Sequence, residues 1–276
     1  MNSLLIIAGL SSALCYGISD YVGGRASARI AIVQVLVIGE LIGAGALWAL
    51  AWWYHDAWLA TELIGVAVGA GMVGAIGVAS LYHGIARGHA AIAAPISALL
   101  AAVIPVIYGI GSDGMPKTLV LVGMAIGIIA IVLNSLSGSI DRFAGLWQGV
   151  LAGVAFGVYF VLLKYLGQAH ALFLPLAMSR SCALLITIPW LLIRPGGRTS
   201  ATGIGLAIVA GGFDIAAGMW YILATQSGRI DIAGVLASLY PGVTVLLAYF
   251  INREQISIPQ RWGLLATIIA TALIAS

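Results

Sequence analysis

Long apolar runs separated by short polar connections fill the whole chain. Ten of these runs approach the ~20 residues that a helix needs to cross a bilayer. None alternates polar and apolar positions as the strand of a membrane barrel does, so the pattern predicts an all-α membrane protein. The predicted transmembrane helices cover residues 3–24, 31–54, 62–84, 90–111, 117–136, 144–166, 171–193, 203–224, 231–251 and 260–275.

The amino-acid composition indicates the same class of protein. Hydrophobic residues make up 62% of the chain and charged residues 8%, whereas soluble domains carry roughly 25% charged residues. The mean hydropathy is +1.11, and a net charge of +3 gives no reason to expect a nucleic-acid partner. We therefore expect a multi-pass protein whose surroundings are the lipid bilayer.

The two halves of the chain repeat at a fixed spacing. Glycines of the first half recur 140 residues later in the second half, as in Gly9 and Gly149 (149 − 9 = 140). The repeat predicts a first unit at residues 1–136, a connecting loop at 137–143 and a second unit at 144–276. Five is an odd number of helices, so the second unit should be inverted relative to the first. Such inverted repeats are typical of alternating-access transporters, which bind substrate at the interface between the units.

The ninth predicted span carries a helix breaker near its middle. Pro241 lacks a backbone donor and its ring clashes with the preceding turn, so Pro241 and Gly242 should interrupt the helix. Inside a membrane the freed carbonyls survive only against protein or a water-lined cavity, which makes such a break a candidate transport site. Pro95 and Pro105 flank the matching point of the fourth span, which we expect to be broken as well. We expect all four residues to act as hinges, and a simple structural kink is the alternative.

Several motifs of the second half together resemble a known family. They are the run Phe156-Gly-Val-Tyr-Phe-Val-Leu-Leu-Lys164, Arg180, the run Ala237-Ser-Leu-Tyr-Pro-Gly-Val-Thr-Val245, Arg253-Glu254 and Gly263. This pattern resembles the EamA-type repeat of the drug/metabolite transporter superfamily, and the first half matches it more loosely. The resemblance implies ten helices, no ATP-binding module, and movement of small metabolites, often amino-acid export. We therefore expect no ATPase subunit, and nothing in the sequence indicates a cofactor.

Two charged residues lie in the middle of predicted spans at matching positions. Glu40 and Arg180 are 140 residues apart (180 − 40 = 140), in the second and seventh spans. A charge there costs at least ~2.5–3.5 kcal/mol on insertion scales, so each side chain should face protein or water. They could contact a substrate or a coupling ion. Alternatively, they have a structural role, paired with each other or with a neighbouring helix.

Two aspartates in spans have different expected roles. Asp214 of the eighth span could bind an ammonium group or carry a proton, or it could bond to a neighbouring helix. Asp20, close to Arg25 near the end of the first span, is expected at a helix interface.

Aromatic and hydroxyl side chains complete the predicted site, which we expect to be a central cavity lined by the third, fourth, eighth and ninth spans. Aromatic rings with a polar tip suit the wall of a wet cavity. An aromatic belt at the membrane surface is the other interpretation of these rings. The predicted substrate-binding residues are Tyr82, His83, Ser97, Asp214, Trp220, Tyr221, Ser238 and Tyr240.

Basic residues are distributed unevenly between the two sets of connections. Eight arginines follow odd-numbered spans, whereas three basic residues follow even-numbered spans. The positive-inside rule then places both termini outside, although members of the resembled family are commonly drawn with both termini inside. The arginines are Arg25, Arg29, Arg87, Arg142, Arg194, Arg198, Arg253 and Arg261, and the other set is Lys117, Lys164 and Arg229.

Taken together, the sequence predicts a transporter of the bacterial inner membrane that moves amino acids or similar small metabolites outward by alternating access. Proton-coupled export of drugs or cations is the alternative transport function. A membrane-embedded enzyme or a channel would be a different class. His55, His83, His89 and His170 are scattered and show no metal-ligand spacing, so we expect neither a metal site nor an enzyme.

Overall fold

The computed structural model describes residues 3–87, 90–135, 145–169, 171, 173–193, 200–253 and 255–275, and every regular element in them is a helix. The predicted loop at 137–143 lies outside these residues, as do Arg142, Arg194, Arg198 and Glu254. The helices are α1 (Ser3–Ser27), α2 (Ile32–Trp53), α3 (Thr61–Ala86), α4 (Ala90–Asp113), α5 (Thr118–Ser135), α6 (Leu146–Leu166), α7 (Leu174–Ile193), α8 (Ala201–Ser227), α9 (Ile230–Ala237), α10 (Tyr240–Asn252) and α11 (Ile258–Ala275).

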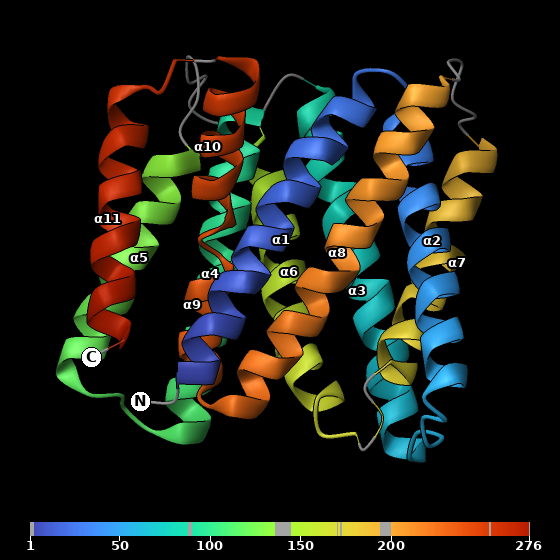
Figure 1. Ribbon diagram of the computed structural model, residues 1–276, viewed down its shortest axis with the longest axis horizontal. Helices are drawn as coiled ribbons and strands as arrows, with labels where there is room; N and C mark the ends of the chain where they lie inside the picture. Colours follow the sequence, from blue (N-terminus) through green and yellow to red (C-terminus); the bar gives the residue numbers. More distant parts are fainter. Residues whose placement is uncertain are drawn as a thin grey trace.

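Ten spans among the described residues are long and apolar enough to cross a membrane, with α9 and α10 together forming the ninth. The predicted fold class, an all-α membrane protein of ten transmembrane helices, is confirmed. The helices run alternately up and down in Figure 1, and both chain termini lie at the same end. We call this end the lower end. The opposite end, which holds the α1–α2 connection at residues 28–31, is the upper end.

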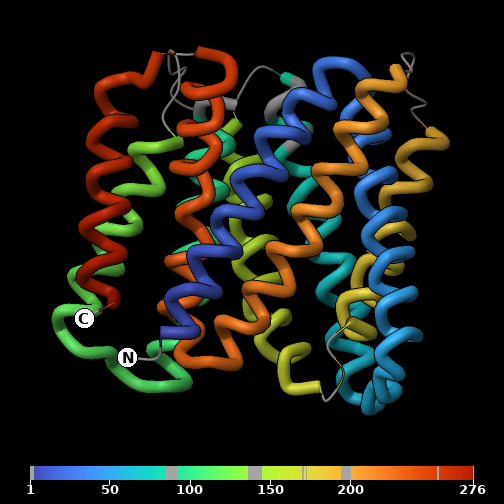
Figure 2. Tube along the Cα trace, viewed as in Figure 1, coloured from blue at the N-terminus to red at the C-terminus, as the bar shows by residue number. Residues whose placement is uncertain are grey.

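Neighbouring helices in space are mostly distant in the sequence. Helix α1 packs against α8, α3 against α6, and α4 against α6 and α9. At the two edges of the bundle, α5 pairs with α11 and α2 pairs with α7 (Figure 2). The same contacts recur when each span is replaced by the span five places away in the chain. The contact of α1 with α8 then corresponds to that of α6 with α3, and the contact of α4 with α6 corresponds to that of α9 with α1.

Glycines allow α2 and α8 to approach at the level of their backbones. A Cβ atom added to Gly211 would lie 2.7 Å from the Cα of Gly39, closer than any real contact of that kind. Such small residues at helix interfaces are what membrane helices use to pack closely. The close approach has a functional consequence, because Glu40 directly follows Gly39 and Asp214 lies one helical turn after Gly211.

The fourth and ninth spans differ from each other in a way that the sequence did not predict. Helix α4 continues through Pro95 and Pro105 without interruption. The ninth span does divide, but at Ser238 and Leu239, so Pro241 falls in the first turn of α10. Proline fits there because the first amides of a helix have no intrahelical partner to lose. The expected interruption of the fourth span is therefore wrong, and the break in the ninth lies slightly earlier than expected.

Candidate functional site

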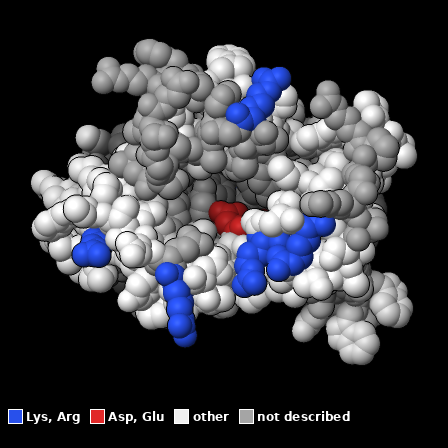
Figure 3. Space-filling view, turned by 90° about the horizontal axis from the view of Figure 1, so that it is seen from above, with Lys and Arg blue, Asp and Glu red and all other residues white. Residues whose placement is uncertain are grey.

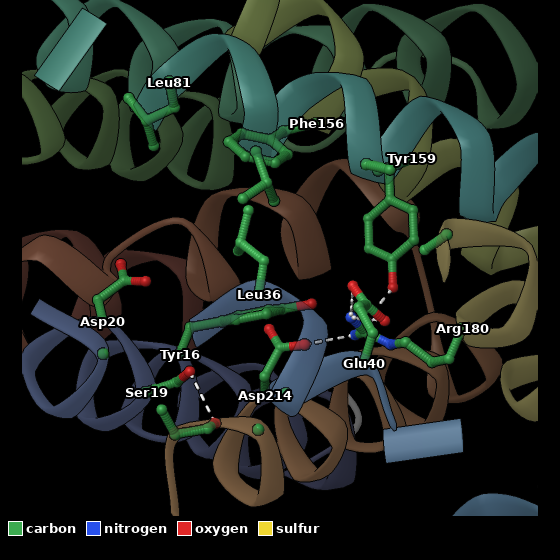
Figure 4. Close-up of a pocket in the computed structure, with 18 of the residues that line it drawn as sticks. Tyr16, Ser19, Asp20, Leu36, Glu40, Leu81, Phe156, Tyr159, Arg180 and Asp214 are labelled. Atoms are coloured by element: carbon green, nitrogen blue, oxygen red, sulfur yellow. Dashed lines mark hydrogen bonds and ion pairs between the residues drawn. The ribbon is translucent and has the colours of Figure 1, made fainter. Parts of the chain in front are cut away.

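Three charged side chains and a tyrosine meet inside the helix bundle (Figure 4). Arg180 of α7 donates from Nη2 to Oδ2 of Asp214 on α8 at 2.6 Å, and from Nη1 to Oε1 of Glu40 on α2 at 3.3 Å. Its Nη2 also donates to the hydroxyl of Tyr159 on α6 at 3.3 Å. Four helices thus contribute one side chain each to this group, which we call the ion cluster.

The ion cluster contains two carboxylates and one guanidinium. The side chains of Arg180 and Glu40 are each 13% exposed, whereas that of Asp214 is 32% exposed and has the widest access to ligands. With all three groups ionised the net charge is −1 (+1 − 2 = −1). In a membrane an uncompensated charge is costly, so a proton or a bound cation would stabilise the cluster. The arrangement is suited to holding a cationic group.

The ion cluster lines a cavity of about 180 Å³, which we call the central cavity. This is room for a small solute, since one water takes about 30 Å³ of liquid volume. Gly39 and Gly211 leave part of this space open, and the rings of Tyr16, Phe156 and Phe160 line other parts of it. The hydroxyl of Tyr16 is buried and has no hydrogen-bond partner among the described residues, so it is available to a ligand.

A second cavity of about 460 Å³, the side cavity, lies among α1, α4, α5 and α10. Three residues line both cavities: Asp20 of α1, Leu81 of α3 and Tyr240 of α10. The lining residues of the side cavity reach the connection between α10 and α11, which belongs to the upper end. Viewed from this end, the protein has a hollow with acidic atoms at its bottom and basic side chains around it (Figure 3). Both observations indicate that the cavities open upward.

Ionic contacts join helices at the lower end. Lys164 at the end of α6 pairs with Asp113 at the end of α4 at 3.6 Å. Arg229, just before α9, pairs with the fully buried Asp231 at 2.7 Å and donates to the backbone carbonyl of Asp113 at 2.9 Å. The hydrogen bonds to Asp231 raise the pKa of Arg229 above its ordinary value, so its charge persists at every physiological pH. These four residues form what we call the lower clamp.

A half-buried carboxylate and a pair of stacked aromatic rings reinforce this closure. Asp56, in the α2–α3 connection, accepts hydrogen bonds from the backbone N–H of Phe173 at 2.7 Å and of Leu174 at 2.8 Å. Tyr221 is fully buried and stacks on Phe160 with 4.5 Å between ring centroids. The protein is therefore closed below the ion cluster and open above it.

Five residues singled out in the sequence line the central cavity: Glu40, Arg180, Asp214, Tyr240 and Asp20. The first three, distant in the sequence, are brought together in the ion cluster. Tyr240 lines the side cavity as well, as do Pro241 of the predicted hinge and Asp20. Asp20 was expected at a helix interface, and its position on two cavities corrects that expectation.

The other predicted binding residues lie elsewhere. Ser97, Tyr221 and Ser238 are buried in helix packing, each with a hydroxyl that has no partner among the described residues. Trp220 packs beside the buried core, and His83 is exposed at the end of α3. The side chain of Tyr82 lies outside the part of the chain that the structure describes. Gly242 is buried in the first turn of α10.

The walls of the central cavity come from other helices than expected. Among the described residues α1, α2, α3, α6, α7 and α8 supply most of the lining, and α4 and α10 supply one residue each. The expectation that the fourth and ninth spans form much of the wall is therefore wrong. Tyr16 and Tyr159 were missed, although Tyr16 and Asp20 lie four residues apart and so share one face of α1. Among the described residues no group of three or more His, Cys, Asp or Glu could hold a metal ion.

Comparisons with known proteins agree with this architecture. Residues 143–276, nearly half of the chain, match the family described as the EamA-like transporter family. One solved structure, described only as "Crystal structure of protein", superimposes with a TM-score of 0.81 at 15% identity, over 100% of this chain and 99% of that one. At this identity the likeness shows the fold alone. No curated protein sequence matches the chain.

Proposed function

Because the chain belongs to the EamA-like transporter family, we propose that it exports small metabolites that carry an ammonium group, amino acids foremost, by alternating access. The observation that carries this proposal is the ion cluster at the inner end of an open cavity. Its two carboxylates share a single guanidinium, which leaves one negative charge to attract an ammonium group. A transported amino acid would exchange its hydration shell for these contacts.

The lining of the central cavity suits the remainder of such a substrate. The free hydroxyl of Tyr16 can donate a hydrogen bond to a substrate carboxylate. The rings of Phe156 and Phe160 offer apolar faces to a hydrophobic or aromatic side chain. An amphipathic amine therefore fits this lining better than a simple sugar or an anion.

The paired arrangement of helices supports alternating access. Each helix of the first five spans contacts the second five in the same pattern as its counterpart, five spans later, contacts the first five. This correspondence is expected of two related units. Helices α1 and α6, which begin the two units, run in opposite directions in Figure 1. We propose that the units 1–136 and 144–276 are inverted repeats, and that the open and closed ends exchange roles during transport.

The charges at the two ends support outward transport. Arg25, Arg29, Arg87, Arg253 and Arg261 lie toward the upper end, which the positive-inside rule assigns to the cytoplasm. The cavities would then load from the cytoplasm, which suits export across a plasma membrane. For a bacterial protein this is the inner membrane.

Counterflow into proteoliposomes tests the proposal with four compounds that share a phenyl ring. They are phenylalanine (zwitterion), phenethylamine (cation), 2-phenylethanol (neutral) and phenylacetate (anion). We expect saturable counterflow of labelled phenylalanine, inhibited by unlabelled phenethylamine and unaffected by phenylacetate. A control with Arg180→Leu protein should give no counterflow. Equal inhibition by all four compounds would contradict a site that selects the ammonium group.

Proton-coupled export of organic cations is the second candidate, and the excess of carboxylates over guanidinium favours it specifically. In that case a proton would replace the departing cation on Asp214. A pH gradient would then drive uphill uptake of phenethylamine, while phenylalanine would show no counterflow. The same vesicles therefore separate the two candidates.

A further inference from the structure

Asp20 occupies a position that the ion cluster does not explain. It lies in α1, within a membrane-spanning helix, and lines both the central cavity and the side cavity. Among the described residues it makes no hydrogen bond or ion pair, and its side chain is exposed. Asp20 therefore lies where the side cavity meets the central cavity, which contains Asp214.

The surroundings of Asp20 form a site for a cation with an apolar tail. Tyr16, one helical turn earlier, and Tyr240 of α10 lie with their ring centroids 6.2 Å apart. Both residues line the central cavity together with Asp20, and Figure 4 shows Tyr16 between Asp20 and Asp214. Aromatic faces beside a carboxylate are the environment in which proteins hold alkylammonium groups.

The charged groups nearby favour a cation at Asp20 over an internal partner. Arg180 is committed to Asp214 and Glu40 in the ion cluster. Arg25, on the same helix, contacts Tyr21 instead, with its guanidinium 5.9 Å from the ring centroid. The hydroxyl of the neighbouring Ser19 donates to the carbonyl of Ala210. Asp20 is thus left without a counter-ion of its own.

We propose that Asp20 is a first binding station for the ammonium group of the substrate, at the junction of the side cavity and the central cavity. The substrate binds there through its ammonium group, with its apolar part against Tyr16 and Tyr240. It then moves inward to the ion cluster. This inference rests on the proposed function for the substrate class and adds a second, outer site to it.

Equilibrium binding of labelled phenethylamine to the purified full-length protein tests the station. Asp20→Asn removes the charge-assisted hydrogen bond to the ammonium group, so the Kd for phenethylamine should rise by at least about tenfold. Asp20→Glu keeps the charge and should stay within about threefold of the wild type, on the same scale. The matched control is Glu62→Gln, an exposed carboxylate in the first turn of α3 at the lower end, which should leave the Kd unchanged.

A second pair of variants tests the same station without removing Asp20. Gly24 lies one turn after Asp20, lines the side cavity and has open space around its missing side chain. In Gly24→Lys the new ammonium can reach Asp20 from the i+4 position and occupy the station, so phenethylamine should again bind at least about tenfold more weakly. Gly24→Met adds similar bulk without charge and should weaken phenethylamine binding by no more than about threefold, so the difference between the two variants reports the charge.

The outcomes separate this inference from the proposed function. A wild-type Kd in Asp20→Asn overturns the station, even where phenylalanine counterflow is intact. An equal loss of binding for phenethylamine and the neutral 2-phenylethanol in Asp20→Asn also overturns it, because damage to the fold would do the same. Charge-dependent binding without any counterflow by the wild type would support the station and sink the transport proposal.

Discussion

The upper and lower ends of the protein are built from the same kind of helix but differ in how they are held. At the lower end, Arg229, Asp231, Asp113 and Lys164 join α4, α6 and α9 in the lower clamp. At the upper end the described residues form no ion pair. Polar contacts there include the hydrogen bond from the hydroxyl of Tyr21 to Oδ1 of Asn252 at 2.6 Å and the cation–π contact of Arg25 with the Tyr21 ring.

This difference indicates where the energy of a conformational change resides. Opening the lower end means separating Lys164 of α6 and Arg229, just before α9, from Asp113 at the end of α4. Closing the upper end breaks no ion pair among the described residues. It fills the cavities with side chains instead. We therefore expect the upward-open form to be the resting state, with the ion cluster between the two ends as the part that both forms share.

The largest expected effect comes from removing the guanidinium between the two ends. Arg180→Leu leaves Glu40 and Asp214 facing each other without a counter-ion, and breaking a buried pair typically costs ~3–5 kcal/mol. We expect a large loss of folded protein, measured as monodisperse yield and as thermal unfolding in detergent. Adding Glu40→Gln and Asp214→Asn to the same chain should recover much of the loss. A stable Arg180→Leu single variant would show that the ion cluster does not hold the fold.

A neighbouring pair of glycines tests the packing that positions the ion cluster. The added Cβ in Gly211→Ala would meet the backbone of Gly39, which cannot move away as a side chain can. Overpacking of this kind typically costs ~1–3 kcal/mol, and it should also push α8 and Asp214 away from α2. Gly212→Ala, whose Cβ would meet nothing within 4 Å, is the matched control. Equal thermal unfolding of the two variants would contradict the close approach of α2 and α8.

Weakening the lower clamp should make opening at the lower end more frequent, so that the two ends differ less in how tightly they are held. Arg229→Gln removes the partner of the buried Asp231 and the link to the end of α4. If this shifts the balance between the two forms by ~1.4 kcal/mol, the population open at the lower end rises about tenfold. The measurement is labelling by a polar thiol reagent of Ala224→Cys, a fully buried position in the lower part of α8, in a background without Cys15 and Cys182.

Its control is Arg87→Gln, which removes an exposed charge at the upper end. Labelling of the cysteine at position 224 should not change in that background. If both arginine variants raise the labelling rate equally, the lower clamp has no special part in keeping the lower end closed.

The smallest expected effect concerns the break in the ninth span. Pro241→Ala restores an N–H and removes the ring clash, so α9 and α10 can join into one helix. We expect unchanged or slightly higher thermal stability, and a counterflow rate reduced several-fold through a biased balance of the two forms, within the tenfold that ~1.4 kcal/mol would produce. A wild-type counterflow rate in Pro241→Ala would show that the break has a purely structural role. Pro105→Ala serves as comparison, because α4 is continuous at that residue.

The sequence by itself determined the ten spans, because a run of about 20 apolar residues has no other stable state in a bilayer than a helix. It also identified Glu40, Arg180 and Asp214, since charges within such runs stand out and need protein or water around them. The break in the ninth span was predicted to within a few residues from the chemistry of Pro241. In the fourth span the same argument failed, since packing decides whether a proline interrupts a membrane helix or is accommodated.

Only the tertiary structure decided which spans face one another. Lipid tails are as apolar as buried side chains, so a membrane helix carries little periodic signal for its protein-facing side. The sequence could not show that α1 and α6 supply Tyr16, Asp20 and Tyr159 to the cavity walls. Nor could it show that Arg180 would lie between two carboxylates from α2 and α8, because that meeting depends on the close approach of Gly39 and Gly211.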